Sequence, residues 1–105
     1  MTATEFIQSL PSKAKPEILE GLETLFHFDI EGEGGGQFSV KITDGKMSVA
    51  TAFEGEPKCV VKTKAETLLG VLDGSVNPTT AVMFGKIKVS NIGELMKYAK
   101  IFGLM

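Results

Sequence analysis

The sequence predicts a two-layer α+β domain, and three observations carry this prediction. Apolar and polar residues alternate between Thr24 and Phe53, apolar residues recur at helical spacing on both sides of that region, and the polar positions of the alternating region share one face. A sheet with one wet face needs helices on its other face only. With 105 residues, we expect one hydrophobic core and a single domain over residues 1–105.

Composition excludes several classes of protein. An apolar fraction of 43% with 23% charged residues is ordinary for a soluble globular chain, and a net charge of −2 gives no basic field for nucleic acid. The longest apolar run, from Ala81 to Phe84, is far too short to span a bilayer. The N-terminal residues lack the features of a secretory signal, and the single cysteine cannot form an internal disulfide. We therefore expect a cytoplasmic protein.

Two short helices are expected at the N-terminus. Thr2 and Glu5 have the spacing of a capping box and precede an apolar face, and Pro11 is expected to end this helix. A second helix should follow Pro16, which fits a first helical turn because its missing N–H is not needed there.

A three-stranded antiparallel meander is expected next. Phe26, Phe28 and Ile30 alternate with polar neighbours, the glycine-rich stretch 32–36 supplies a turn, and a second alternating run follows. Asp44-Gly45 is a strong hairpin signal, and the third strand is expected to extend from Met47 to Phe53. A fourth strand is expected at Cys59 to Val61, after a break at residues 55–57.

Helices return in the C-terminal half. Thr63 and Glu66 have capping-box spacing at the start of a helix that Gly74 should end, and Asn77-Pro78 should open a short helix ended by Gly85. A short strand at Ile87 to Val89 follows. Asn91 and Glu94 should open a last helix of up to 15 residues.

The last helix carries more apolar surface than one packing layer needs. A stripe formed by Ile92, Leu95, Met96, Ala99 and Phe102 is widened by Tyr98 and Ile101 to roughly 220°, whereas about 100° suffices against a single layer. Residues 103–105 add further apolar surface. Either the helix is simply buried, or its surplus lines a ligand pocket, for which the five methionines are suitably adaptable.

The sequence contains no recognisable catalytic, metal or cofactor constellation. His27, the only histidine, is expected to be an ordinary surface residue, since no zinc-ligand partners accompany it. Cys59 is expected to be a buried, inert thiol, because no local signature supplies an activating base. The stretch 32–36 joins two strands and lacks the Gly-Lys-Ser/Thr ending of a phosphate loop.

A family resemblance is carried by the segments Leu68–Gly74, Asn77-Pro78 and Ala81–Val89, and it extends upstream to Phe26–Ile30. Through these segments, nearly the whole chain resembles the sterol carrier protein type-two family. The resemblance implies a five-stranded mixed sheet with helices on one face, enclosing an apolar tunnel for fatty acids, fatty acyl-CoAs, phospholipids or sterols. No tryptophan occurs where the family usually has one near the first strand, and the C-terminal residues do not form a peroxisomal Ser-Lys-Leu signal.

The leading hypothesis is therefore a lipid carrier without catalytic activity, cofactor or metal. It would bind a lipid or fatty acyl ligand, contact a membrane transiently, and exist as a monomer or weak homodimer. The residues expected to line the tunnel are Phe28, Val40, Phe53, Leu68, Leu72, Val82, Met83, Phe84, Leu95, Met96, Ala99 and Phe102. The alternative is an interaction module that buries the same apolar surface in a homodimer or against a protein partner. An enzyme acting on acyl chains is a third reading, which lacks residues for the chemistry.

Overall fold

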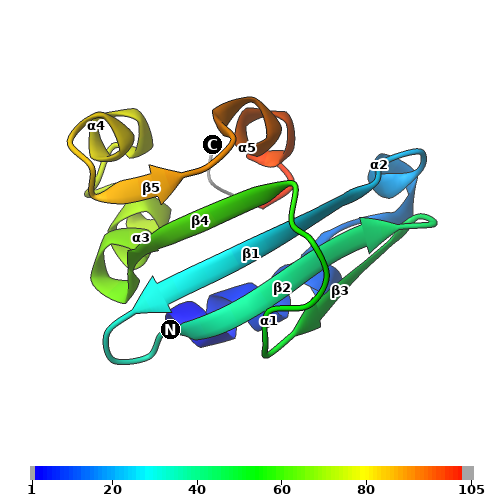
Figure 1. Cartoon of the computed structure of the whole chain (residues 1–105), viewed down its shortest axis with the longest axis horizontal. Coiled ribbons are helices and arrows are strands. Elements are labelled where there is room, and N and C mark those ends of the chain that lie inside the picture. The colour runs from blue at the N-terminus through cyan, green and yellow to red at the C-terminus, as the bar shows by residue number, and fades with distance from the viewer. Residues whose placement is uncertain (1, 103–105) are drawn as a thin grey trace.

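The computed structural model describes residues 2–102 and confirms the α+β fold, with helices on one face of a five-stranded mixed sheet (Figure 1). The elements follow in the order α1 (Ala3–Lys13), α2 (Pro16–Leu19), β1 (Thr24–Glu31), β2 (Gly36–Thr43), β3 (Lys46–Ala50), β4 (Cys59–Lys64), α3 (Ala65–Asp73), α4 (Pro78–Met83), β5 (Ile87–Val89) and α5 (Ile92–Tyr98). Among these residues, no helix is long and apolar enough to cross a membrane.

The sheet has the strand order β3-β2-β1-β4-β5, and among the described residues only β1 and β4 pair in parallel. Phe26 on β1 lies opposite Val40 in the antiparallel pair and beside Cys59 in the parallel pair. A parallel pair requires a crossover, and the connection from β3 to β4 crosses the open face of the sheet while α1 lies behind it (Figure 1).

Because of the period-two alternation, every second side chain of a strand is apolar and lies on the face that the helices cover. The buried apolar side chains of the strands are Phe26, Phe28, Ile30, Phe38, Val40, Ile42, Met47, Cys59, Val61 and Ile87. Helix α1 adds Phe6, Ile7 and Leu10 to the same core, and α5 and the turn after it add Tyr98 and Phe102. The core therefore lies between the sheet and one layer of helices, as the one-sided alternation predicted.

The crossover segment 51–58, which we call the strap, differs from the sequence prediction. The third strand ends at Ala50 rather than at Phe53, because the chain bends away to bond with side chains of the open face. Ser39 Oγ donates to the Ala52 carbonyl (2.7 Å) and accepts from the Glu54 N–H (2.8 Å). These two bonds satisfy strap backbone groups that have left the sheet ladder.

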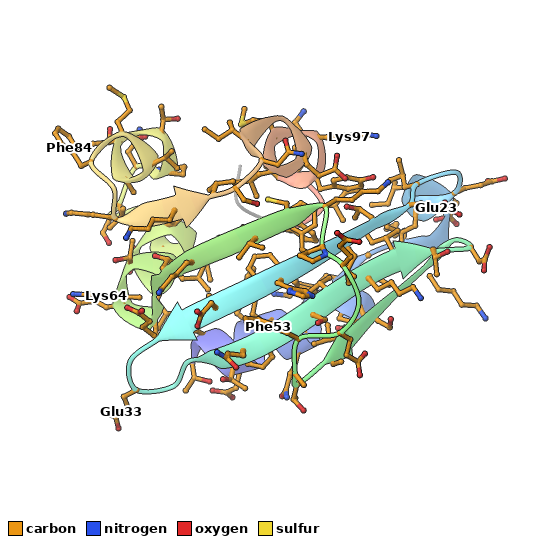
Figure 2. All side chains as sticks on the ribbon, viewed as in Figure 1. Glu23, Glu33, Phe53, Lys64, Phe84 and Lys97 are labelled. Carbon is orange, nitrogen blue, oxygen red and sulfur yellow. The ribbon has the colours of Figure 1, made fainter. Side chains whose placement is uncertain are left out.

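His27 is not the exposed surface residue that the sequence suggested. The strap covers it, so that only 7% of its surface remains exposed. Its Nε2 lies 2.8 Å from the Glu54 carbonyl oxygen, which requires a proton on Nε2, and its ring stacks on Phe53 at a centroid distance of 4.6 Å. Figure 2 shows Phe53 on the strap, in front of the sheet. His27 is thus part of the packing that holds the strap down.

The helix termini agree with the predicted caps in most places. The capping box of Thr2 and Glu5 is present, and Asn77 and Asn91 each accept a backbone N–H three residues on. Helix α1 nevertheless continues through Pro11 to Lys13, because a proline in the last turn removes only one helical hydrogen bond.

Two predictions for the C-terminal half are wrong. The N-cap of α3 is Lys64 rather than Thr63, since Thr63 belongs to β4 and its hydroxyl donates to the Lys86 carbonyl at 3.0 Å. Helix α5 ends at Tyr98 instead of continuing toward the C-terminus, although Phe102 N–H still bonds the Tyr98 carbonyl in the following turn. The predicted apolar contribution of residues 103–105 lies outside the described residues.

Candidate functional site

Four buried aromatic side chains join the sheet to α5 and the turn that follows it. Phe26 and Phe28 come from β1, while Tyr98 and Phe102 come from the C-terminal segment. Phe102 meets Phe26 edge-to-face at a centroid distance of 4.9 Å and Phe28 at 5.7 Å, and Phe26 meets Tyr98 at 5.8 Å. All four rings are at most 2% exposed. We call these residues the aromatic cluster. Its contacts show that protein side chains occupy the middle of the space between sheet and α5.

A few polar contacts tie α5 to the neighbouring strand ends. Thr24 Oγ1 donates to Glu94 Oε2 at 2.6 Å, and Tyr98 Oη donates weakly to the Glu23 carbonyl at 3.4 Å. At the start of the helix, Asn91 Nδ2 donates to the Lys58 carbonyl at 3.3 Å. Burial, followed by the charge of Glu94, raises the pKa of Tyr98. Helix α5 is therefore held by aromatic contacts and by only a small number of hydrogen bonds.

The predicted tunnel residues separate into an inner and an outer group. Eight lie on the inner side of the sheet, either buried or packed against the core: Phe28, Val40, Leu68, Leu72, Val82, Leu95, Ala99 and Phe102. The other four are exposed. Phe53 lies across the sheet in the strap, Met83 and Phe84 lie at the end of α4 with 77% and 76% of their surface exposed, and Met96 lies on the outer side of α5.

Phe26 and Tyr98 lie on the same inner side of the sheet but were absent from the predicted set. Phe26 is completely buried, and the alternation with Phe28 already placed both on one face. Tyr98 is also completely buried, although the sequence placed it beside the expected stripe rather than within it. The helical stripe that faces the core is centred on Leu95, Tyr98 and Phe102, which leaves Ile92 and Met96 exposed.

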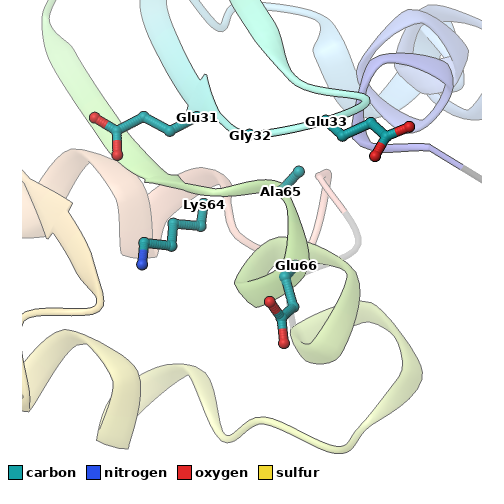
Figure 3. A pocket seen from close by; sticks show the side chains of 6 residues that line it. All are labelled: Glu31, Gly32, Glu33, Lys64, Ala65 and Glu66. Carbon is teal, nitrogen blue, oxygen red and sulfur yellow. The ribbon is translucent and has the colours of Figure 1, made fainter.

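Two surface hollows have charged residues in their linings. One, of about 290 Å³, lies where the β1–β2 turn faces the junction of β4 and α3, and Figure 3 shows its lining residues Glu31, Gly32, Glu33, Lys64, Ala65 and Glu66. The other, of about 320 Å³, is lined by Gly21, Leu22, Glu23, Asp44 and Lys97. Because Glu23 also accepts the hydroxyl of Tyr98, this second hollow lies beside the contacts that hold α5.

Within the described part of the chain, no three side chains of His, Cys, Asp and Glu are placed so that they could hold a metal ion. Cys59 is fully buried, and its Sγ donates to the Asn91 carbonyl at 3.4 Å. Burial raises the pKa of the Cys59 thiol, which keeps it protonated and weakens it as a nucleophile. The inner side of the sheet therefore offers apolar surface and aromatic rings, rather than groups suited to acid–base or nucleophilic chemistry.

Comparisons with known proteins agree with this arrangement. The family model described as "SCP-2 sterol transfer family" matches residues 3–103. Sterol carrier protein 2 of Gallus gallus is 35% identical over 77 residues, which cover 70% of this chain and 14% of that protein. The chain spans 14% and 25% of the length of the curated relatives it matches.

Two solved structures show the same fold. The solution structure of palmitated SCP2L2 from Aedes aegypti has a TM-score of 0.73 at 19% identity, with 97% of this chain and 95% of that chain covered. The stereoselective inverting sec-alkylsulfatase of Pseudomonas sp. has a TM-score of 0.77 at 17% identity, with all of this chain but 16% of that chain covered. From the family match over residues 3–103, the chain belongs to the SCP-2 sterol transfer family, and membership implies lipid binding and transfer.

Proposed function

We propose that the protein carries a single-chain acyl lipid, such as a fatty acid or its CoA ester, between the sheet and α5. The observation that carries this proposal is the aromatic cluster, in which Phe102 fills the space between β1 and α5 while the segment bearing it is weakly held. The palmitated state of the Aedes aegypti relative supports an acyl ligand for this fold. The apolar, non-nucleophilic lining supports a carrier rather than an enzyme.

The proposed lining is the inner group of predicted residues together with Phe26 and Tyr98. In the structure these side chains fill the space themselves, so an acyl chain must displace part of the cluster. Phe102 is the side chain we expect to move, because it follows the last helix rather than lying within a strand. Its neighbours Phe26 and Phe28 are held in the β1 ladder on both sides.

The hydrophobic effect makes this exchange favourable for a long chain only. Exposing Phe102 costs about 1.5–3 kcal/mol, whereas each buried methylene of the ligand returns about 0.8 kcal/mol. The first few methylenes only offset the displaced ring, and further ones contribute to affinity. We expect affinity to rise about 200-fold between an eight-carbon and a twelve-carbon fatty acid, since four methylenes correspond to about 3.2 kcal/mol.

Native mass spectrometry of freshly purified protein, followed by lipid analysis, tests the function directly. We expect a monomer that releases an acyl lipid on solvent extraction. Displacement of a fluorescent fatty acid by acids of increasing length should then give the predicted dependence on chain length. A lipid-free dimer without saturable acyl binding would instead favour the interaction module.

Hydrogen exchange tests the proposed route into the core. Residues 98–102 should lose protection when ligand binds, because the acyl chain takes the place of the Phe102 ring and frees the segment that bears it. The amides of β1 should change little, since they are already bonded to β2 and β4. Unchanged exchange at residues 98–102 would place the entrance elsewhere.

A further inference from the structure

A second apolar feature lies outside the core, at the C-terminal end of α4. Six large apolar side chains are exposed among the described residues, and four of them lie between residues 83 and 96. Met83 and Phe84 are the most exposed, at 77% and 76%. Figure 2 shows Phe84 projecting from the end of α4, away from the sheet. We call Met83, Phe84, Lys86 and Lys88 the α4 tip.

The backbone holds the α4 tip in a defined conformation. Gly85 has a φ of +75°, its N–H bonds the Val82 carbonyl at 3.1 Å, and the Lys86 N–H bonds the Ala81 carbonyl at 2.8 Å. This pair of bonds is a Schellman motif, which ends the helix and reverses the chain direction. Ala81 is buried against the core, so the opposite side of the turn must face outward. The exposure of Phe84 therefore follows from a well-bonded turn.

The chain segment that carries this apolar point is positive, although the chain as a whole is negative. Residues 74–93 contain Lys86 and Lys88 and no acidic residue. The whole chain carries −2, so the segment contributes +2 and the rest of the chain −4. Both lysines are exposed and flank Ile87, which points into the core from the edge strand β5. In the described residues, neither lysine forms an ion pair; the neighbouring Lys62 pairs with Glu31 at 3.3 Å.

We propose that the α4 tip docks the protein on an anionic lipid bilayer, with Met83 and Phe84 entering the interface and Lys86 and Lys88 binding lipid phosphates. Exposed apolar residues rimmed by lysines match a surface that is apolar beneath a layer of negative charge. A second copy of the chain fits less well, because a two-fold contact at this point would bring the lysines of both copies together. This inference rests on the proposed function, since a lipid carrier must meet the surface that supplies its ligand.

The chain has no tryptophan, so single-tryptophan variants report insertion at a chosen point. Phe84→Trp places the reporter at the α4 tip, and Ile18→Trp is its matched control. Ile18 on α2 is also an exposed apolar residue, with 50% of its surface exposed, but it lies between Glu17 and Glu20. We expect a blue shift of Phe84→Trp emission on adding phosphatidylcholine vesicles that contain 30% phosphatidylserine, and no shift for Ile18→Trp.

Charge reversal tests whether Lys86 and Lys88 bind the vesicles. The same change in net charge is made at the α4 tip and at a distant control site. Lys86→Glu/Lys88→Glu should weaken co-sedimentation with the anionic vesicles at least tenfold. Lys41→Glu/Lys46→Glu, on the distant β2–β3 hairpin, should weaken it less than threefold. Equal effects of the two pairs, equal binding to pure phosphatidylcholine, or no vesicle binding at all would each overturn the proposal.

Two further measurements separate this surface from the alternatives. A blue-shifted Phe84→Trp spectrum in a dimer without vesicles would assign the α4 tip to a second copy and overturn the proposal. Acyl binding is measured on the wild-type protein without vesicles, so that the two hypotheses fail separately. Vesicle docking without acyl binding would contradict the proposed function, whereas acyl binding without vesicle docking would contradict the proposed role of the α4 tip.

Discussion

The substitution Phe102→Ala distinguishes a ring that the ligand displaces from a ring that the ligand touches. Phe102 is 1% exposed and lies within 4.9 Å of Phe26 and 5.7 Å of Phe28, between ring centroids. Removing such a buried ring costs about 3–5 kcal/mol of folding free energy. If the ligand normally displaces the ring, the variant no longer loses the 1.5–3 kcal/mol of burial on binding. Acyl affinity should therefore rise about 10- to 150-fold while unliganded stability falls.

The assay combines urea unfolding with displacement of a fluorescent fatty acid. At the same acyl-ligand concentration, Phe102→Ala should gain more stability than the wild type, because stabilisation by a ligand grows as its Kd falls and reaches about 2.7 kcal/mol at 100 times the Kd. Phe6→Ala is the matched control, since Phe6 is also buried, at 5%, but lies on α1. It should lose stability without gaining affinity. If Phe102→Ala does not fold, Phe102→Leu tests the same sign with a smaller loss.

A weaker acyl ligand affinity in folded Phe102→Ala would refute this reasoning. It would mean that the ring forms a wall of the site and that some other side chain yields to the ligand.

Three further predictions concern other parts of the fold. Ala99→Phe adds a ring at a position that is 4% exposed, so acyl affinity should fall at least tenfold and the free energy of unfolding should fall by about 1–3 kcal/mol. Normal acyl affinity in this variant would mean that Ala99 does not line the ligand site. Ser39→Ala leaves two strap backbone groups without partners and should lower the free energy of unfolding, measured in urea, by about 2 kcal/mol. Ser48→Ala, on the same open face, should change it little. Both variants should still bind acyl ligand. Burial raises the pKa of Tyr98, so above about pH 10 the folded state keeps a phenol proton that the unfolded chain releases. The free energy of unfolding should therefore be constant near neutral pH in this respect and decline above about pH 10. Tyr98→Phe should reduce that decline, and an unchanged pH profile would assign it to other groups such as Cys59.

Local sequence signals predicted the elements whose partners are local. Asn77 and Asn91 cap their helices through bonds to residues three positions on, and the Asp44-Gly45 turn joins β2 to β3. The period-two alternation identified the apolar face because every second side chain of a strand must share it. These features require no knowledge of the rest of the fold.

The errors occurred where a distant residue decides the local structure. Thr63 had the spacing of a cap, but its hydroxyl bonds the Lys86 carbonyl next to β5 instead. The third strand stops early because Ser39 and His27 bind the strap across the open face. Such competition depends on strand order, which alternation alone does not specify.

For the site, the sequence predicted an excess of apolar surface but not its distribution. The predicted arc assumed a helix through Phe102, whereas α5 ends at Tyr98. The structure divides the residues of the arc between the aromatic cluster and an exposed outer side that includes Ile92 and Met96. A helical wheel gives the width of an apolar face, whereas its orientation depends on packing against β1 and β4. For the same reason Phe84 could be assigned to a tunnel on sequence grounds, although the Schellman turn presents it outward.

The distribution of contacts explains why uptake and docking would belong to the same edge of the sheet. β1 and β2 are bonded to neighbours on both sides, and α1 and the strap cover opposite faces of their half of the molecule. By contrast, the edge strand β5 has three residues and stands between two short helices, α4 and α5 (Figure 1). Segments with few contacts open at the lowest free energy. If α5 opens while the α4 tip rests on a bilayer, an acyl chain can pass between membrane and core over a short path with little exposure to water.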